Sequence, residues 1–287
     1  MAYTVDSAFL EFYQRINLSG DFRALAAIRR NHIVGLLGNR FDVIDGFAGG
    51  SIPKFTSLKT ADLDIFVVLH FGKHCCNKPP SQVLLAVRQA LNAKPSVRRN
   101  GQAVTLKYSS FPDVDVVPVF FTSHDGVRYD EALFLNVPDM NTETWIRSRP
   151  KDHVGAIDTQ AAVCGPNFRR VIKILKHWNS LHGNLLRNYH IECVALQQLT
   201  SVDVAALPQA VFVFFRVLAS AVLGPYSYDG DQVDNYLAVG ERLTLYRKLV
   251  QARDAANTAW FMGMLGAGEQ AINQWRSIFG NQFPSYG

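Results

Sequence analysis

The sequence predicts an α/β protein of two lobes, in which a mixed sheet with helices precedes a helical lobe, with a cleft between them. Of its 287 residues 48% are hydrophobic, enough to fill a large core. The expected strands stop after Pro150, and helical patterns dominate from there to the end. We therefore expect residues 1–150 to form the sheet lobe with N-terminal helices, and residues 151–287 to form the helical lobe.

The first lobe is expected to begin with two helices. Apolar residues recur at helical spacing from Ser7 to Leu37, and Gly20-Asp21 suits a helix start. The expected strands, bounded by turn residues, are Phe41 to Phe47, Leu63 to Phe71, Val104 to Tyr108 and Val114 to Phe121, with a helix from Ser81 to Leu91.

Helical patterns fill the second lobe. The expected helices run from Pro166 to Leu181, Tyr189 to Leu199, Pro208 to Leu223, Glu241 to Met262 and Glu269 to Phe279. The most apolar run, Ala210 to Leu223, is shorter than a membrane span and contains Arg216. We interpret it as a buried helix and expect no membrane association.

Acidic residues stand at the start of two expected strands, beside a glycine turn. Gly50 and Ser51 form a turn whose backbone amides can bind a phosphate. Asp62 and Asp64 follow, and residues two apart on a strand face the same way, so their repulsion favours a cation between them. Asp115 repeats the pattern at a second strand. Three carboxylates beside such a turn suit two hard divalent ions and a triphosphate, the layout of a nucleotidyltransferase.

Two alternatives to this acidic site stay open. Asp113 lies two residues before Asp115 and faces the same way, so either can be the third ligand, and the other interpretation of Asp113 is a solvated residue at the strand entry. For Asp62 and Asp64 the alternative is a surface turn, although an acid just inside an apolar strand needs partners.

The expected helix after Pro166 carries a basic flank beside an apolar stripe. Arg169, Lys173 and Lys176 lie along that flank. Lys176 borders the stripe most closely, so we choose it as the lysine that reaches the phosphates of a bound nucleotide. The alternative is a solvated basic flank.

The ordered set of motifs carries a resemblance. Gly50-Ser51, Asp62-Leu63-Asp64-Ile65 and Asp115-Val116-Val117-Pro118 resemble the DNA polymerase beta nucleotidyltransferase superfamily. Further segments are similar to the cyclic GMP-AMP synthase and bacterial dinucleotide cyclase-like enzymes, the CD-NTases; they are Trp145, Arg149 to His153, Val171 to Asn179, Tyr189 to Glu192 and Ala271 to Pro284. The family's Asp-apolar-apolar-Pro pattern favours Asp115 over Asp113.

The resemblance implies a polymerase-beta-like catalytic lobe that works with two Mg²⁺ (or Mn²⁺) ions. Asp62 and Asp64 would hold the ion that binds the donor triphosphate. Asp115 would join them at the second ion and help to deprotonate the acceptor hydroxyl.

The resemblance also implies the nucleotide contacts. Gly50 and Ser51 would bind the β- and γ-phosphates, and Lys176 would neutralise charge on the triphosphate. Asn188 stands where the family often has serine and keeps a hydrogen-bonding group for the nucleotide.

The implied reaction condenses nucleoside triphosphates, ATP with or without GTP, UTP or CTP, into a cyclic di- or trinucleotide and releases pyrophosphate. The implied setting is bacterial anti-phage signalling of the CBASS type, with a downstream effector that binds the product. A ubiquitin-transfer-like partner that joins Gly287 to a target is a further expectation, against an ordinary frayed end.

Two other functions stay open. An RNA- or tRNA-tailing nucleotidyltransferase would use the same acids, but the net charge of +5 is modest for it. Its RNA contact would involve the basic cluster Lys94, Arg98, Arg99 and Lys107, which otherwise faces water. A catalytically silent signalling protein that binds nucleotide or RNA is the third hypothesis, and the complete acidic triad argues against it.

The cysteines and the N-terminus predict a cytoplasmic setting. The four cysteines form no evident disulfide framework, which favours a reducing compartment. The first residues lack a basic region followed by an apolar stretch, so we expect no signal peptide.

Overall fold

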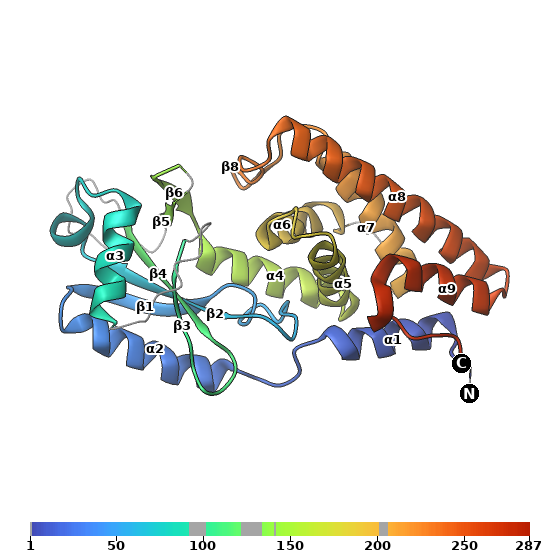
Figure 1. Ribbon diagram of the computed structural model, residues 1–287, viewed down its shortest axis with the longest axis horizontal. Helices are drawn as coiled ribbons and strands as arrows, with labels where there is room; N and C mark the ends of the chain where they lie inside the picture. Colours follow the sequence, from blue (N-terminus) through green and yellow to red (C-terminus); the bar gives the residue numbers. More distant parts are fainter. Residues whose placement is uncertain (1, 92–101, 122–133, 141, 201–205) are drawn as a thin grey trace. The chain divides into compact units, whose positions relative to one another are not determined.

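The computed structural model describes residues 2–91, 102–121, 134–140, 142–200 and 206–287, and Figure 1 labels most of its helices and strands. The chain divides into two compact units. The sheet unit comprises Gly20–Phe55 and Thr60–Gly155, and the helical unit comprises Met1–Ser19, Thr56–Lys59 and Ala156–Gly287.

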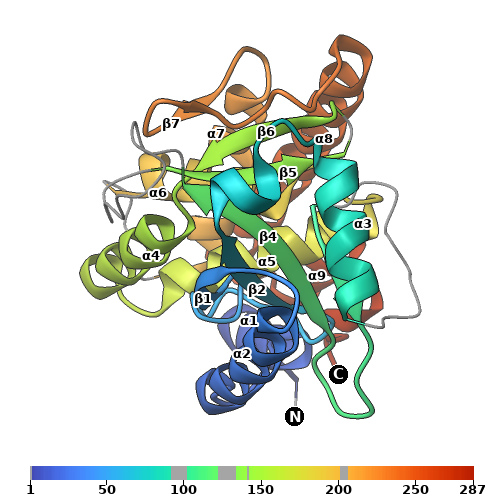
Figure 2. The same cartoon turned by 90° about the vertical axis from the view of Figure 1, so that its left-hand side faces the viewer.

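The sheet unit holds a mixed sheet with helices packed against it (Figure 2). Its strands are β1 (Val43–Gly49), β2 (Leu63–Leu69), β3 (Val104–Leu106), β4 (Val114–Phe121), β5 (Leu135–Asp139) and β6 (Thr144–Ser148). Its helical elements are α2 (Arg23–Gly38), the π-helical turn η1 (Phe71–Cys75) and α3 (Pro80–Ala90), and α4 (Pro150–Cys164) begins in this unit.

The sheet has the strand order β1-β2-β4-β5-β6, with β3 also paired to β4. β2 and β4 run parallel, whereas the other pairs are antiparallel. Leu63 lies opposite Val114, so β2 and β4 start at the same edge of the sheet. This edge is where the predicted acids stand.

Alternation along β2 separates the two faces of the sheet. Leu63, Ile65 and Val67 are buried, and the half-buried Asp64 and Phe66 between them point to the other face. This second face is therefore polar where the strands start. An apolar cluster of the sheet unit is formed by Val68, Val117, Val119, Leu135 and Val137.

The predicted α/β fold class, with a mixed sheet followed by a helical part, is confirmed. The predicted strand over Val114 to Phe121 matches β4 at both ends.

The prediction missed β5, β6 and α4. It was also wrong that strands stop after residue 150, because β7 (Ser227–Tyr228) and β8 (Asp231–Gln232) form a short hairpin. Asn136, Pro138 and Asp139 give β5 a weak strand propensity that its pairing with β6 overrides.

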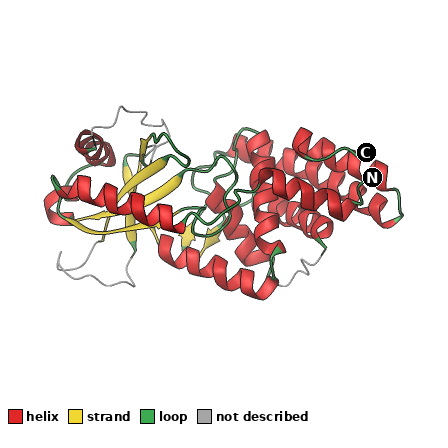
Figure 3. Ribbon diagram, turned by 90° about the horizontal axis from the view of Figure 1, so that it is seen from below, coloured by secondary structure: helices red, strands yellow, loops and turns green. Residues whose placement is uncertain are grey.

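The helical unit is built from helices shown in red in Figure 3. Besides the remainder of α4 they are α1 (Val5–Ile16), α5 (Asn167–Leu181), α6 (Asn188–Gln198), α7 (Leu207–Ala221), α8 (Val239–Met264), α9 (Gly268–Phe279) and the 3-10 turn η2 (Gly280–Gln282). The five helices predicted from Pro166 onward correspond to α5 to α9. Within the described stretches, no helix is long and apolar enough to cross a membrane.

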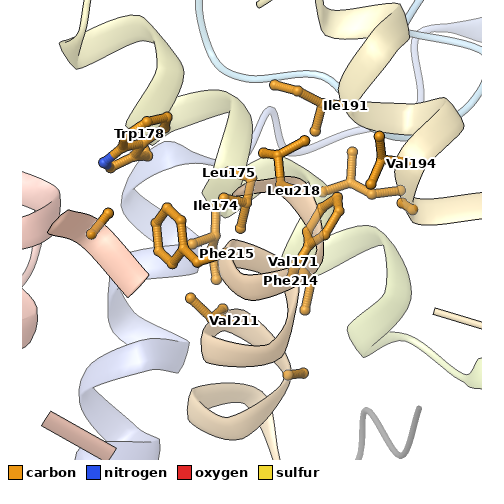
Figure 4. Close-up of a cluster of buried hydrophobic side chains, with 14 of the residues drawn as sticks. Val171, Ile174, Leu175, Trp178, Ile191, Val194, Val211, Phe214, Phe215 and Leu218 are labelled. Carbon is orange, nitrogen blue, oxygen red and sulfur yellow. The ribbon is translucent and has the colours of Figure 1, made fainter. Parts of the chain in front are cut away.

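Part of the core of the helical unit lies between α5, α6 and α7 (Figure 4), and α1, α4, α8 and α9 contribute further buried side chains to it. Apolar side chains repeat along α5 at helical spacing, which directs them to one side. The labelled residues of this core are Val171, Ile174, Leu175 and Trp178 from α5, Ile191 and Val194 from α6, and Val211, Phe214, Phe215 and Leu218 from α7.

Helix α1 packs with the helical unit, which differs from the predicted division at residue 150. Phe9 meets Trp275 edge to face at a ring-centroid distance of 4.8 Å, and it meets Phe283 at 5.1 Å. The backbone amide of Tyr3 also donates to the carbonyl of Tyr286 at 3.0 Å. The two ends of this unit are therefore joined by aromatic packing, which a division by sequence position does not reveal.

His190 on α6 makes the stability of the helical unit depend on pH. Its ring is fully buried, with Nδ1 3.1 Å from the Tyr236 hydroxyl. Burial lowers the pKa of His190 to about 4; Asp234 opposes the shift and Arg242 reinforces it. In the unfolded chain His190 has the ordinary histidine pKa of 6.5. Below that pH the unfolded chain therefore takes up a proton on His190 more readily than the folded chain does.

The free energy of unfolding is therefore expected to fall as the pH drops from about 6.5 toward 4. At pH 5 the loss from this one group is about 2 kcal/mol. Urea unfolding of wild type and His190→Gln at pH 7.5 and pH 5 measures it, with the exposed His32→Gln as the control. Burial also lowers the pKa of His177, so part of the pH dependence is expected to persist in His190→Gln. An equal pH dependence in all three proteins would contradict the assignment.

Candidate active site

Gly50 directly follows β1, in a turn that lies against the carboxylate of Asp64. Gly50 has φ +67, a backbone conformation that favours glycine. A Cβ placed on Gly50 would lie 1.7 Å from Oδ2 of Asp64. Gly49 is the ladder partner of Asp64 in the antiparallel pairing of β1 with β2. The glycine turn predicted from the sequence therefore lies directly against an acid of the predicted site.

Asp64 and Asp115 are direct partners across the parallel strands β2 and β4. Partnered residues of adjacent strands project to the same face, so the two carboxylates are neighbours. Both side chains are half-buried, as is Asp62, which precedes β2 by one residue. Thr105 on β3 donates its hydroxyl to Oδ1 of Asp115 at 2.5 Å, which orients that carboxylate.

Asp113, the competing third acid, has different surroundings. Its Oδ2 lies 2.5 Å from Nζ of Lys107, and the backbone amide of Tyr108 donates to its Oδ1 at 3.0 Å. The hydrogen bond from Lys107 and the one from Tyr108 hold the pKa of Asp113 below its usual value. Its strand register and its pairing with Lys107 set Asp113 apart from the Asp64–Asp115 pair, which supports Asp115 as the third acid.

These acids fit divalent-ion chemistry only in part. Carboxylate oxygens are the donors that Mg²⁺ and Mn²⁺ prefer. In the part of the chain that the structure describes, however, no three His, Cys, Asp or Glu side chains gather as a ready-made metal-ligand group. The structure brings Asp64 and Asp115 together beside Gly50, and Asp62 precedes them at the start of β2.

Lys176, the predicted phosphate lysine, belongs to the helical unit and is only 2% exposed. Its Nζ lies 2.6 Å from Oε1 of Glu192 on α6. The same ammonium donates to the hydroxyl of Thr56 at 3.1 Å and to its carbonyl at 3.2 Å. Lys176 is therefore buried in a hydrogen-bonded cluster and does not lie on a solvated flank, and its phosphate contact stays a prediction.

The other members of the basic flank on α5 also have partners. Lys173 is buried and donates to Oδ1 of Asn17, and burial lowers its pKa to about 8. Arg169 pairs with Asp158 at 2.5 Å. The solvated alternative is wrong for Lys173.

Asn188, the remaining predicted nucleotide contact, is the first residue of α6 and is exposed. The amide groups at a helix N-terminus favour anions. Its position is compatible with a phosphate contact, which stays a prediction. Of the predicted basic cluster, Lys94, Arg98 and Arg99 lie outside the described residues.

Sequence reasoning gave no role to Thr56 and Glu192. Glu192 stands inside the apolar run Ile191 to Leu196 of α6. A charge in such a run needs a buried partner, and this signal could have revealed Glu192. Thr56 lies in an irregular segment, so no pattern in the sequence marked it.

Comparison with known proteins assigns the chain to a family. Residues 3–160, more than half of the chain, match the family model of the Second Messenger Oligonucleotide or Dinucleotide Synthetase (SMODS) domain. The chain belongs to the SMODS family of CD-NTases. It is therefore a nucleotidyltransferase, as the sequence predicted.

Two curated proteins are similar to this CD-NTase over its whole length. A probable cyclic nucleotide synthase of Bacillus cereus (strain VD146) is 23% identical, covering 100% of this chain and 99% of the relative. The cyclic AMP-AMP-AMP synthase of Acinetobacter sp. (strain ATCC 27244 / 9458) is 22% identical, covering 99% of this chain and 76% of the relative.

Solved structures of the family share its fold. E. coli MS115-1 CdnC, determined with ATP, has a TM-score of 0.77 at 20% identity and covers 98% of this chain and 99% of its own. The Vibrio cholerae cyclic AMP-GMP synthase DncV has a TM-score of 0.62 at 14% identity, covering 98% and 88%. At these identities the likeness supports the fold.

Proposed function

We propose that this CD-NTase condenses nucleoside triphosphates into a cyclic di- or trinucleotide second messenger and releases pyrophosphate. The observation that carries the proposal is the Asp64–Asp115 pair, in register on β2 and β4 and in contact with the Gly50 turn. Two adjacent carboxylates beside a phosphate-binding turn match the needs of nucleotidyl transfer.

We assign the acids and the turn to different parts of the reaction. Asp62, Asp64 and Asp115 would hold two Mg²⁺ or Mn²⁺ ions, which supply charge stabilisation at the phosphates and lower the pKa of the attacking hydroxyl. The hydroxyl of Thr105 keeps the Asp115 carboxylate oriented. The backbone amides of Gly50 and Ser51, with the serine hydroxyl, would bind the β- and γ-phosphates of the donor.

In the helical unit we assign a nucleotide contact to Asn188, at the N-terminus of α6. We assign no phosphate to Lys176, because its ammonium is buried against Glu192 and Thr56. A phosphate would reach it only if that cluster opened.

The relatives support a proposal for substrates and partners. ATP is bound to CdnC, ATP and GTP are bound to DncV, and one relative is named for a cyclic triadenylate. We infer that ATP is a substrate here, either alone or together with a second nucleoside triphosphate.

We also infer a downstream effector that binds the product and a role in anti-phage signalling. A protein partner is supported by the CdnC:HORMA complex of a relative, and conjugation of Gly287 is a separate hypothesis.

Product identification tests the proposal. The purified chain is incubated with Mg²⁺ or Mn²⁺ and all four labelled ribonucleoside triphosphates, treated with phosphatase, and analysed by chromatography and mass spectrometry. A phosphatase-resistant cyclic oligonucleotide is expected. Extension of added RNA as the sole product would favour the tailing enzyme, and binding without turnover would favour the silent signalling protein.

A further inference from the structure

The ion pair of Lys176 and Glu192 is among the most deeply buried charge pairs of the helical unit. Lys176 is 2% exposed, Glu192 is 1% exposed, and Thr56 between them is fully buried. The hydroxyl of Thr56 donates to Oε1 of Glu192 at 2.6 Å, and the Lys176 ammonium donates to the same Oε1 at 2.6 Å. The three side chains thus form a hydrogen-bonded cluster.

The Lys176 ammonium has several partners in this cluster. A lysine ammonium has three N–H groups. It donates hydrogen bonds to Oε1 of Glu192, to the hydroxyl of Thr56 and to the carbonyl of Thr56. A phosphate ligand would have to break this arrangement, so the geometry favours a role inside the protein.

A buried ion pair is a poor source of stability, because removing two charges from water offsets much of their attraction. Apolar residues of similar volume often serve the fold equally well. What apolar residues cannot do is bind the backbone carbonyl of Thr56. The specific result of the Lys176–Glu192 pair is therefore the fixed position of residue 56.

The segment Thr56–Lys59 is held by α1 as well. The amide of Lys59 donates to the carbonyl of Ile16 at 3.1 Å, and Asn17 forms a bridge with Leu58. Along the chain this segment follows the Gly50-Ser51 turn and precedes Asp62 and Asp64. It belongs to the helical unit, whereas the chain on both sides of it belongs to the sheet unit.

We propose that Lys176 and Glu192 are positioning residues. They hold Thr56 and thereby restrict the positions of the phosphate-binding turn, Gly50-Ser51, and of Asp62 and Asp64. This role rests on the proposed nucleotidyl transfer, because it concerns the residues that perform it. Thr56 lies close to Ser51 and to Asp62 in the sequence, so we expect a displacement at Thr56 to reach both residues through the backbone.

The variants are chosen to separate positioning from folding. Breaking one half of a buried pair can unfold the chain. The main variant therefore replaces both charges by apolar residues, Lys176→Met with Glu192→Leu. Thr56→Val removes the hydroxyl at nearly constant volume, and Thr56→Ser retains it. Arg253→Gln, in an exposed pair with Asp254 on α8, is the matched control for loss of a charge.

The double apolar variant is expected to fold and to lose about 100-fold in kcat, the effect of misplacing reacting groups by about 1 Å. Its KM for ATP is expected to change by less than about threefold. Thr56→Val is expected to lose about tenfold in kcat, the worth of one hydrogen bond, and Thr56→Ser is expected to restore it. Arg253→Gln is expected to match wild type. An increase of tenfold or more in KM with unchanged kcat in the double variant would instead make Lys176 a phosphate ligand.

Hydrogen exchange on the nucleotide-free protein tests the positioning without any reaction. Amides of residues 57–62 are expected to exchange at least about tenfold faster in the double variant, with those of α7 and α8 unchanged. Equal exchange of residues 57–62 in wild type and double variant would overturn the inference. If wild type makes no product, the proposed function fails, and the exchange result still decides whether the cluster holds this segment.

Discussion

Asp64→Asn and Asp115→Asn are each expected to lower cyclic product formation by at least about 1000-fold. The two carboxylates are partners across β2 and β4, so each substitution removes one negatively charged metal ligand from the same pair. Charge stabilisation by a bound metal ion is worth several kcal/mol, and each 1.4 kcal/mol is a factor of ten. Product formed from labelled ATP under excess Mg²⁺ or Mn²⁺ is the measurement.

Asp113→Asn is the matched control for this prediction. Its carboxylate pairs with Lys107 and with the amide of Tyr108, so its loss is expected to change product formation by less than about tenfold. If Asp113→Asn removes activity and Asp115→Asn keeps it, the assignment of the third acid is reversed.

A thermal readout separates metal binding from damage to the fold. Without metal, removing one of two adjacent negative charges relieves their repulsion, so Asp64→Asn and Asp115→Asn should unfold no more easily than wild type. Mg²⁺ or Mn²⁺ is expected to raise the Tm of wild type, by preferential binding to the folded chain, and to leave both variants nearly unchanged. An equal rise in all of them would place the ion elsewhere.

The parts of the fold that the sequence predicted are those with strong local patterns. β4 combines β-branched residues with a turn before it, and its bounds matched. α5 repeats its apolar residues at helical spacing. By contrast, α4 (Pro150–Cys164) has a weakly amphipathic sequence, and β5 and β6 depend on each other for their ladder. Such elements are set by tertiary pairing more than by local propensity.

The candidate site was predictable where each residue is unusual within its own segment. The Gly50 turn, Asp64 and Asp115 could be found because acids within apolar strands are unusual. The partners of Lys176 could not, since Thr56 is 120 residues away in sequence and no periodicity relates them. The same holds for α1, whose Phe9 packs against Trp275 and Phe283 near the other end of the chain.

Gly50→Ala is expected to remove at least about 99% of the activity and to destabilise the sheet unit. The new Cβ would lie 1.7 Å from Oδ2 of Asp64, and at φ +67 an alanine is strained as well. The left-handed conformation alone costs about 1–2 kcal/mol, and relieving the clash must displace Asp64 or the turn. A displacement of about 1 Å at such a site lowers the rate about 100-fold.

Gly165→Ala is the matched control, because Gly165 has φ +77 and a Cβ added there would meet no atom within 4 Å. It carries the backbone strain without the clash, so it should lose stability by about 1–2 kcal/mol and keep full activity. Product assays and urea unfolding of both variants compare the two effects. Equal activity of Gly50→Ala and Gly165→Ala would show that contact between the turn and Asp64 is not required for the reaction.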